Sequence, residues 1–115
     1  MEAIFKRCSV RKYTEEPVTD KELEQLLRAA MAAPSAKNSQ NWLYFVQKGQ
    51  GSLPTLQEVH PNAFALQTAT AAIVVCADKK KGVQTDPLND WWIHNCSAAT
   101  ENILLQAADL GLGSL

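Results

Sequence analysis

The sequence has little of several features that would place it in a specialised class of protein. Its three cysteines, Cys8, Cys76 and Cys96, are odd in number and lack the paired spacing of metal ligands. That pattern argues against both a disulfide framework and a zinc site. The two histidines, His60 and His94, stand isolated, and we interpret both as structural or surface residues. No metal site is therefore expected.

An excess of charge of one sign is also lacking. The formal net charge is −1, whereas nucleic acids and anionic membrane surfaces require concentrated positive charge on a protein that binds them. The one basic run, Lys79 to Lys81, is interpreted as part of a solvated loop. Nucleic acid is therefore not expected as the main partner.

Long apolar runs are missing. The longest, Ala71 to Ala77, is far too short to span a bilayer as a helix. Near the N-terminus, Glu2, Lys6 and Arg7 interrupt any apolar segment of secretory length. We expect a cytoplasmic protein without a membrane partner.

The sequence also lacks a phosphate-binding glycine loop and a recognisable nucleophile with its base. Gly111 and Gly113 follow a predicted helix instead of preceding one, so we interpret them as a helix cap and a strand entry. Ser35 has no evident base. No catalytic side chain is predicted.

The composition is that of an ordinary globular domain. Hydrophobic residues make up 46% of the 115 positions and charged residues 20%, which argues against disorder over most of the chain. A chain of this size buries roughly two thirds of its unfolded surface on folding. We expect one domain, residues 1–115, of the α+β or α/β class.

The first long helix is marked by its capping signals. Thr19 and Glu22 form a capping box, and Val18 with Leu23 supplies the hydrophobic staple. Pro34 is expected to stop the helix, because proline biases the preceding residue away from helical geometry. The apolar positions recur at helical spacing and predict one buried face: Leu23, Leu26, Leu27, Ala30 and Met31.

The rest of the chain predicts strands and further helices. Aromatic and β-branched content predicts a strand over 42–47, and Ser52 is expected to cap a short helix over 53–59. The continuous apolar run over 71–77 predicts a central strand with both faces buried. A polar loop is expected over 78–87. A long helix is expected over 89–110, apolar on more than one face, which predicts burial on several sides.

The stretch from Ala33 to Trp42, here called the elbow, joins the first long helix to the first strand. Ser35, Asn38, Ser39 and Gln40 can each donate and accept hydrogen bonds. The elbow could present these groups and its backbone N–H groups to a flat polar ligand. The alternative is a solvated connection built from ordinary turn formers.

The N-terminal segment offers a second candidate site. We expect Ala3, Ile4 and Phe5 to anchor a short helix that brings Arg7, Ser9 and Arg11 together, as the sequence places them at alternate positions. Guanidinium groups present several donors in a fixed fork and keep their charge, which suits a phosphate. The alternative is an ordinary surface arginine pair.

Four blocks, taken in this order and spacing, resemble the nitroreductase family of FMN-dependent oxidoreductases. The blocks are Arg7 to Tyr13, the elbow, Cys96 to Leu105, and Gly111 to Gly113. The resemblance implies a nitroreductase-like fold, with a central sheet flanked by helices and a long buried helix at a homodimer interface. It also implies FMN as cofactor, NAD(P)H as hydride donor and a nitroaromatic, quinone or similar small acceptor in a ping-pong cycle.

The resemblance further implies that the flavin lies between two subunits. Arg7 and Ser9 correspond to groups near the phosphate and ribityl chain, and Arg11 to a group near the pyrimidine edge, where it would stabilise negative charge on the reduced ring. Asn62 is a weaker candidate for the ring edge. The implied cofactor-binding residues are Arg7, Cys8, Ser9 and Arg11 of one subunit with Pro34, Ser35, Asn38 and Gln40 of the other, and Asn62.

The sequence departs from the family pattern in three ways. Asn41 stands where the family usually has proline, which should loosen the elbow. Asn95 stands where an acidic residue is common, which removes a charge from the long helix. The family continues beyond Leu115 with further strands, a backbone contact to the flavin and another basic phosphate ligand. An alternative function is thus a truncated homologue that acts as a dimerising module without competent flavin binding.

Overall fold

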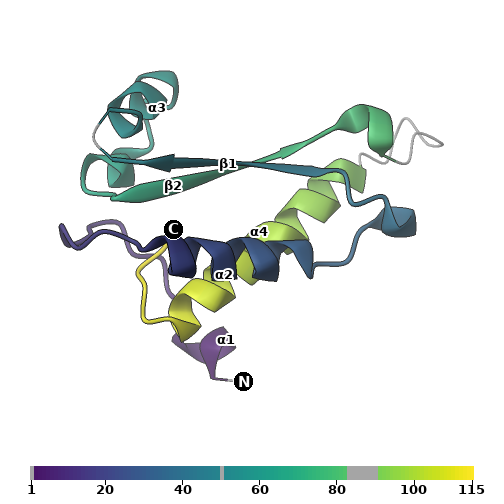
Figure 1. Ribbon diagram of the computed structural model, residues 1–115, viewed down its shortest axis with the longest axis horizontal. Helices are drawn as coiled ribbons and strands as arrows, with labels where there is room; N and C mark the ends of the chain where they lie inside the picture. The colour runs from purple at the N-terminus through teal and green to yellow at the C-terminus, as the bar shows by residue number, and fades with distance from the viewer. Residues whose placement is uncertain (1, 50, 83–90) are drawn as a thin grey trace.

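The computed structural model places a two-stranded ribbon across a pair of helices (Figure 1). It describes residues 2–49, 51–82 and 91–115. Short 3-10 turns cover Ala36–Asn38, Phe64–Gln67 and Lys79–Lys81. The helices and strands are α1 (Ala3–Lys6), α2 (Asp20–Met31), β1 (Trp42–Lys48), α3 (Leu53–Val59), β2 (Ala71–Ala77) and α4 (Trp91–Asp109). The fold is α+β, as expected.

Helix α2 begins at the predicted capping box. The Glu22 N–H donates to Thr19 Oγ1 at 3.2 Å, and the Thr19 N–H and hydroxyl each donate to Glu22 Oε2 at 2.8 Å. Val18 packs against the core that contains Leu23, as the predicted staple requires. The helix ends at Met31, three residues before Pro34. Met31 itself is 54% exposed, so the buried face of α2 is one residue shorter than expected.

Strands β1 and β2 pair in antiparallel register, with Tyr44 opposite Val75. Trp42, Tyr44 and Val46 alternate along β1 and pack against the core, because side chains at every second position share a face. The intervening Leu43 and Phe45 lie on the other face and are exposed. In the described ranges β2 pairs with β1 alone, so the central position predicted for 71–77 is not observed.

The core forms where α2 packs against α4. Its buried side chains are Leu23, Leu26, Ala30 and Ala33 from α2 and its end, with Ala99, Ile103 and Ala107 from α4. The α4 residues follow a spacing of four, which places them on one face of the helix. The alanines let the two backbones approach closely. The helix pair lies on one side of the ribbon, and α3 lies on the other (Figure 1).

The C-terminal end of α4 is closed as the sequence predicted. Gly111 has φ +75°, a left-handed conformation that glycine adopts without steric cost. The Leu112 N–H donates to Ala107 O at 2.9 Å, and the Gly111 N–H donates to Ala108 O at 3.2 Å. These two bonds form a Schellman motif.

Some expectations of local structure were wrong. Helix α1 forms, but Phe5 is 89% exposed and Ile4 is 49% exposed, so neither anchors it within one chain. Ser52 does not cap α3; its hydroxyl donates instead to Lys48 O. Asp78 caps a 3-10 turn over Lys79–Lys81 in what was expected to be a loop. The predicted helix start at Asn89 lies outside the described residues, as does the second half of the loop.

No helix within the described ranges combines the length and apolar character needed to cross a bilayer. The same ranges hold no cluster of three or more His, Cys, Asp or Glu residues that could bind a metal ion.

The capping box predicts a pH-dependent contribution to stability. Hydrogen bonds from the Thr19 backbone and hydroxyl lower the pKa of Glu22 below its ordinary value of 4.5. A lowered folded-state pKa gives stability that is present above the ordinary pKa and is lost as pH falls through the folded pKa. Glu22→Gln keeps an accepting oxygen but cannot titrate. Thermal melts should therefore show the wild-type advantage over Glu22→Gln shrinking in acid.

Glu24→Gln, an exposed change on α2 outside the capping box, is the matched control. If the wild-type advantage over Glu22→Gln does not change with pH, the ionised capping box does not contribute to stability.

Candidate functional site

The two groups of predicted site residues lie at opposite ends of the helix pair (Figure 1). The N-terminal segment lies beside the last turn of α4, where the Val10 N–H donates to Ser114 O at 2.9 Å and Ser9 forms a bridge with Ser114. The elbow lies near the start of α4, where the Ala36 N–H donates to Asn95 Oδ1 at 3.0 Å. At about 1.5 Å per residue, the helix between Asn95 and Asp109 separates the two groups by roughly 20 Å.

The elbow holds three non-glycine residues in the left-handed region. Lys37, Asn38 and Gln40 have φ of 51°, 53° and 46°. Asparagine tolerates this conformation better than lysine or glutamine, so the strain lies chiefly at Lys37 and Gln40. Local bonds support it: Gln40 N–H donates to Ser35 Oγ at 3.0 Å, and Asn38 N–H to Ser35 O at 2.9 Å.

This backbone turns the predicted ligand groups outward. Asn38, Gln40 and Pro34 are exposed and Ser35 is half-buried. In the described part of the chain, the side chains of Asn38 and Gln40 form no hydrogen bond, and the Ser35 hydroxyl keeps its proton available to donate. The elbow therefore offers amide and hydroxyl groups on one exposed turn.

The expectation that Asn41 loosens the elbow was wrong. Asn41 is 1% exposed, its Oδ1 accepts from Asn95 Nδ2 at 3.0 Å, and its Nδ2 faces Asp78 O at 3.4 Å. Its carbonyl also accepts from the Asp78 N–H at 2.8 Å. A proline here would have no amide side chain and would restrict Gln40 to extended geometry. Asn41 therefore ties the elbow to β2 and α4.

The N-terminal segment presents two cations, Arg7 and Arg11, near the chain surface. Cys8, Ser9 and Arg11 are exposed and Arg7 is half-buried. Neither guanidinium group forms a hydrogen bond or ion pair with another described residue. Arg11 lies close enough to Tyr13 to oppose the rise in the Tyr13 pKa that partial burial causes. Such a segment can receive an anion.

Asn62 joins neither group. It is exposed and lies three residues beyond the end of α3, which stands on the side of the ribbon away from α2 and α4 (Figure 1). One chain thus brings Ser35, Asn38 and Gln40 together and keeps Arg7, Ser9 and Arg11 together elsewhere. Whether any of them contacts a flavin stays a prediction.

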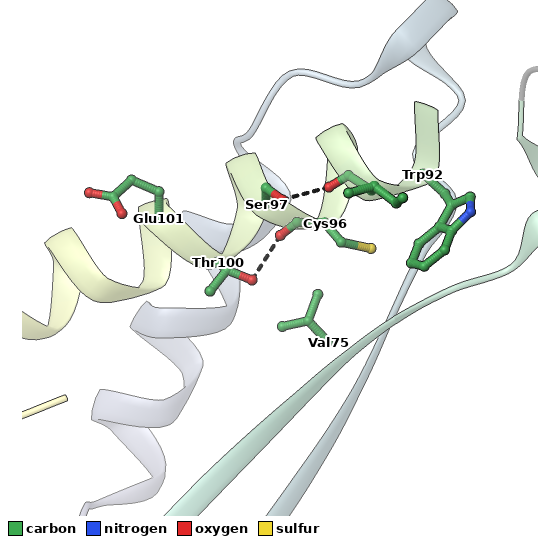
Figure 2. Close-up of a pocket in the computed structure, with 7 residues that line it drawn as sticks. Val75, Trp92, Cys96, Ser97, Thr100 and Glu101 are labelled. Atoms are coloured by element: carbon green, nitrogen blue, oxygen red, sulfur yellow. Dashed lines mark hydrogen bonds between the residues drawn. The ribbon is translucent and has the colours of Figure 1, made fainter. Parts of the chain in front are cut away.

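Sequence reasoning missed a cavity of about 490 Å³ between β2 and the first half of α4. Figure 2 shows Val75, Trp92 and Cys96 turned toward the same space, while Glu101 points away from it. The spacing of Trp92, Cys96 and Thr100 by four was the signal that one helix face lines it. The lining residues are Val75, Trp92, Ile93, Cys96, Ser97, Thr100 and Glu101.

Two titratable groups beside this cavity, Cys96 and Tyr44, have raised pKa values. Burial, and then the neighbouring Cys76, raises the pKa of the Cys96 thiol. Burial, and then Cys96, raises the pKa of Tyr44 to about 12. A protonated thiol is a poor nucleophile and metal ligand. The Tyr44 hydroxyl and Trp92 Nε1 are buried and find no hydrogen-bond partner within the described residues. Neither the Cys96 thiol nor the Tyr44 hydroxyl therefore acts as a base near neutral pH.

With this geometry in place, comparison with known proteins identifies the family. Residues 4–59 match the model of the nitroreductase family. A protein from Archaeoglobus fulgidus, named as a candidate NADH dehydrogenase/NAD(P)H nitroreductase, is 44% identical over all 115 residues. The chain belongs to the nitroreductase family.

Solved structures support the same nitroreductase fold. A candidate NADH oxidase from Clostridium acetobutylicum superposes with a TM-score of 0.87 at 40% identity, over 96% of this chain and 64% of that one. A candidate nitroreductase from Desulfovibrio desulfuricans, solved in complex with FMN, gives 0.85 at 29% identity, over 97% and 63%. This nitroreductase-family chain spans 64% of the length of the Archaeoglobus relative.

The left-handed elbow leads to a prediction on backbone strain. Lys37→Gly should leave the free energy of unfolding unchanged or raise it by up to about 1 kcal/mol, because relief of about 1–2 kcal/mol at a left-handed residue exceeds the extra entropy that glycine loses. The control, Arg28→Gly, removes an exposed cation from within α2 and should cost about 1 kcal/mol. Denaturant unfolding measures both. Equal destabilisation by the two changes would contradict a left-handed Lys37.

Proposed function

We propose that this chain forms the FMN-binding portion of a nitroreductase-type NAD(P)H oxidoreductase, with each flavin held between two copies of the chain. The observation that carries the proposal is the split site. Arginines suited to a phosphate lie at one end of α4, and groups suited to a flat heteroaromatic ring lie at the other. The FMN complex of the Desulfovibrio relative, which shares the fold, supports the choice of cofactor.

The donor set fits FMN in two halves. Arg7 supplies a fixed positive charge for the phosphate, Ser9 supplies a hydroxyl for the ribityl chain, and Arg11 supplies a second fixed charge near the pyrimidine edge. The polar edge of the flavin ring carries both hydrogen-bond donors and acceptors. Ser35, Asn38 and Gln40 supply donors and acceptors that can pair with it. These elbow groups are already turned outward by the left-handed backbone. Pro34 contributes a rigid apolar surface beside them.

The separation of the two groups supports a second copy of the chain. The two groups lie roughly 20 Å apart along α4, at about 1.5 Å per residue, and the ribityl chain of FMN is far shorter than that. In the proposed dimer, one copy supplies the N-terminal segment and the other the elbow. Exposed apolar side chains support such a dimer, because large exposed apolar patches often mark sites of protein association. The exposed side chains are Ile4, Phe5, Trp91 and Ile93.

When bound, FMN supplies the redox chemistry, taking hydride from NAD(P)H and passing reducing equivalents to a nitroaromatic, quinone or similar acceptor in a ping-pong cycle. The chain's own residues bind and orient. Arg11, placed near the pyrimidine edge, would favour the anionic reduced form through its fixed charge. This division of labour agrees with the raised pKa values of Tyr44 and Cys96 beside α4, which keep both groups protonated near neutral pH. We place the enzyme in the cytoplasm.

The phosphate assignment predicts the effect of removing both arginines. The wild-type chain, mass-checked and desalted after addition of FMN, should retain flavin absorption at close to one FMN per chain. Arg7→Ala/Arg11→Ala should weaken FMN binding by several kcal/mol, on a scale of about 1.5–3 kcal/mol for each charge-assisted bond.

Lys12→Ala, a neighbouring exposed cation, is the control and should leave the affinity nearly unchanged. Unaltered affinity in the double variant would refute the phosphate site. A colourless wild-type protein of correct mass would favour the alternative function, a dimerising module without flavin.

The dimer is tested at α4. Leu104 is half-buried and lies next to Ile103 on the helix surface, beside the face that packs within the chain. Leu104→Asp should abolish dimerisation, because the interface would bury an unpaired charge. Thr55→Asp introduces the same charge at an exposed position of α3, on the other side of the ribbon, and is the control. Sedimentation and circular dichroism report assembly and folding; a folded Leu104→Asp dimer would rule out this interface.

A further inference from the structure

Asn95 collects hydrogen bonds from along the elbow. It is 3% exposed, and its Oδ1 accepts from the Ala36 N–H at 3.0 Å. Its Nδ2 donates to Asn41 Oδ1 at 3.0 Å and to Ser39 Oγ at 3.3 Å. Its main-chain carbonyl accepts from Trp42 Nε1 at 2.9 Å. Four residues between the first turn of the elbow and the start of β1 therefore converge on one residue of α4.

Asn41 at the far end of the elbow also bonds to Asp78, just after β2, but the remaining hydrogen bonds of residues 35–40 cannot fix the elbow in place. Asn38 N–H and Gln40 N–H both bond to Ser35, and Ser39 N–H bonds to Ala36 O. All three bonds join residues within the elbow, so they set its internal shape but not its place on the molecule. Left-handed residues at 37, 38 and 40 add backbone strain, which persists only where surrounding contacts hold it.

We propose that Asn95 is the positioning residue that fixes the elbow against α4, so that its exposed amide and hydroxyl groups keep one orientation toward their ligand. The inference rests on the proposed function in so far as that ligand is FMN. It goes beyond it by assigning the orientation of the site to a buried side chain that does not touch the ligand.

The chemistry of the contacts selects an amide at position 95. Ala36 N–H needs an acceptor, while Asn41 Oδ1 needs a donor, because Asn41 Nδ2 is directed at Asp78 O. An asparagine side chain offers both functions on neighbouring atoms. Leucine has a similar size but offers neither, and it would leave buried polar groups of the elbow unpaired, which is costly. Aspartate keeps an acceptor for Ala36.

Asn102 provides a matched control on the same helix. It lies seven residues after Asn95, which places it on the same face two turns later. It is half-buried, and its Nδ2 donates to Ala29 O of α2 at 3.0 Å. Asn102→Leu therefore removes a hydrogen bond from an asparagine of α4 to the backbone of α2, and it leaves the hydrogen bonds of the elbow in place.

The test combines amide hydrogen exchange, read residue by residue by NMR, with FMN titration. Asn95→Leu should speed exchange at residues 36–40 by roughly tenfold or more, and weaken FMN binding by a similar factor, while the core amides of α2 and α4 keep their protection. Asn95→Asp should rescue protection of the Ala36 N–H. Asn102→Leu should change neither elbow exchange nor FMN affinity.

Elbow exchange in Asn95→Leu that matches Asn102→Leu would overturn the proposal. If Asn95→Leu does not fold, the aspartate variant decides, since fast Ala36 exchange in a folded Asn95→Asp chain would also overturn it. A wild-type chain that retains no FMN would refute the proposed function alone, because the exchange comparison does not depend on flavin.

Discussion

The close packing of α2 against α4 is the constraint on which the rest of the structure depends. Ala30 and Ala99 are fully buried, and Ala107 nearly so, which allows the two helix backbones to approach closely. Asn102 adds a bond from α4 to the backbone of Ala29. With this helix pair fixed, the apolar surface that it presents is covered by the ribbon of β1 and β2. The elbow and the N-terminal segment then lie at opposite ends of this helix pair, so the two do not meet within one chain.

Much of the fold was predictable because its signals are local. The capping box at Thr19 and Glu22, the stop before Pro34 and the left-handed cap at Gly111 each depend on a few neighbouring residues, and each occurs where the sequence indicated. The aromatic and β-branched content of residues 42–47 was equally informative, since such side chains favour strands. These features set boundaries and faces. They do not say how the elements meet.

The features that could not be predicted depend on residues far apart in the sequence. Nothing in the sequence around Asn41 indicates that its amide meets Asn95, 54 positions later, and a substitution expected to loosen the elbow instead ties it down. The exposure of Phe5 and the cavity beside Cys96 likewise follow from how elements pack. The candidate site residues were grouped by resemblance to a family. The structure adds that one chain holds them in two separate sets.

The contact between Gly113 and Val10 has a consequence for how the chain acquires its shape during synthesis. A Cβ at position 113 would lie 3.0 Å from Val10 Cγ1, so the N-terminal segment fits tightly over a position with no side chain. The backbone bond from Val10 to Ser114 closes a loop of more than a hundred residues. During synthesis, residue 10 therefore cannot make this contact until residues 113 and 114, more than a hundred positions later, have been made.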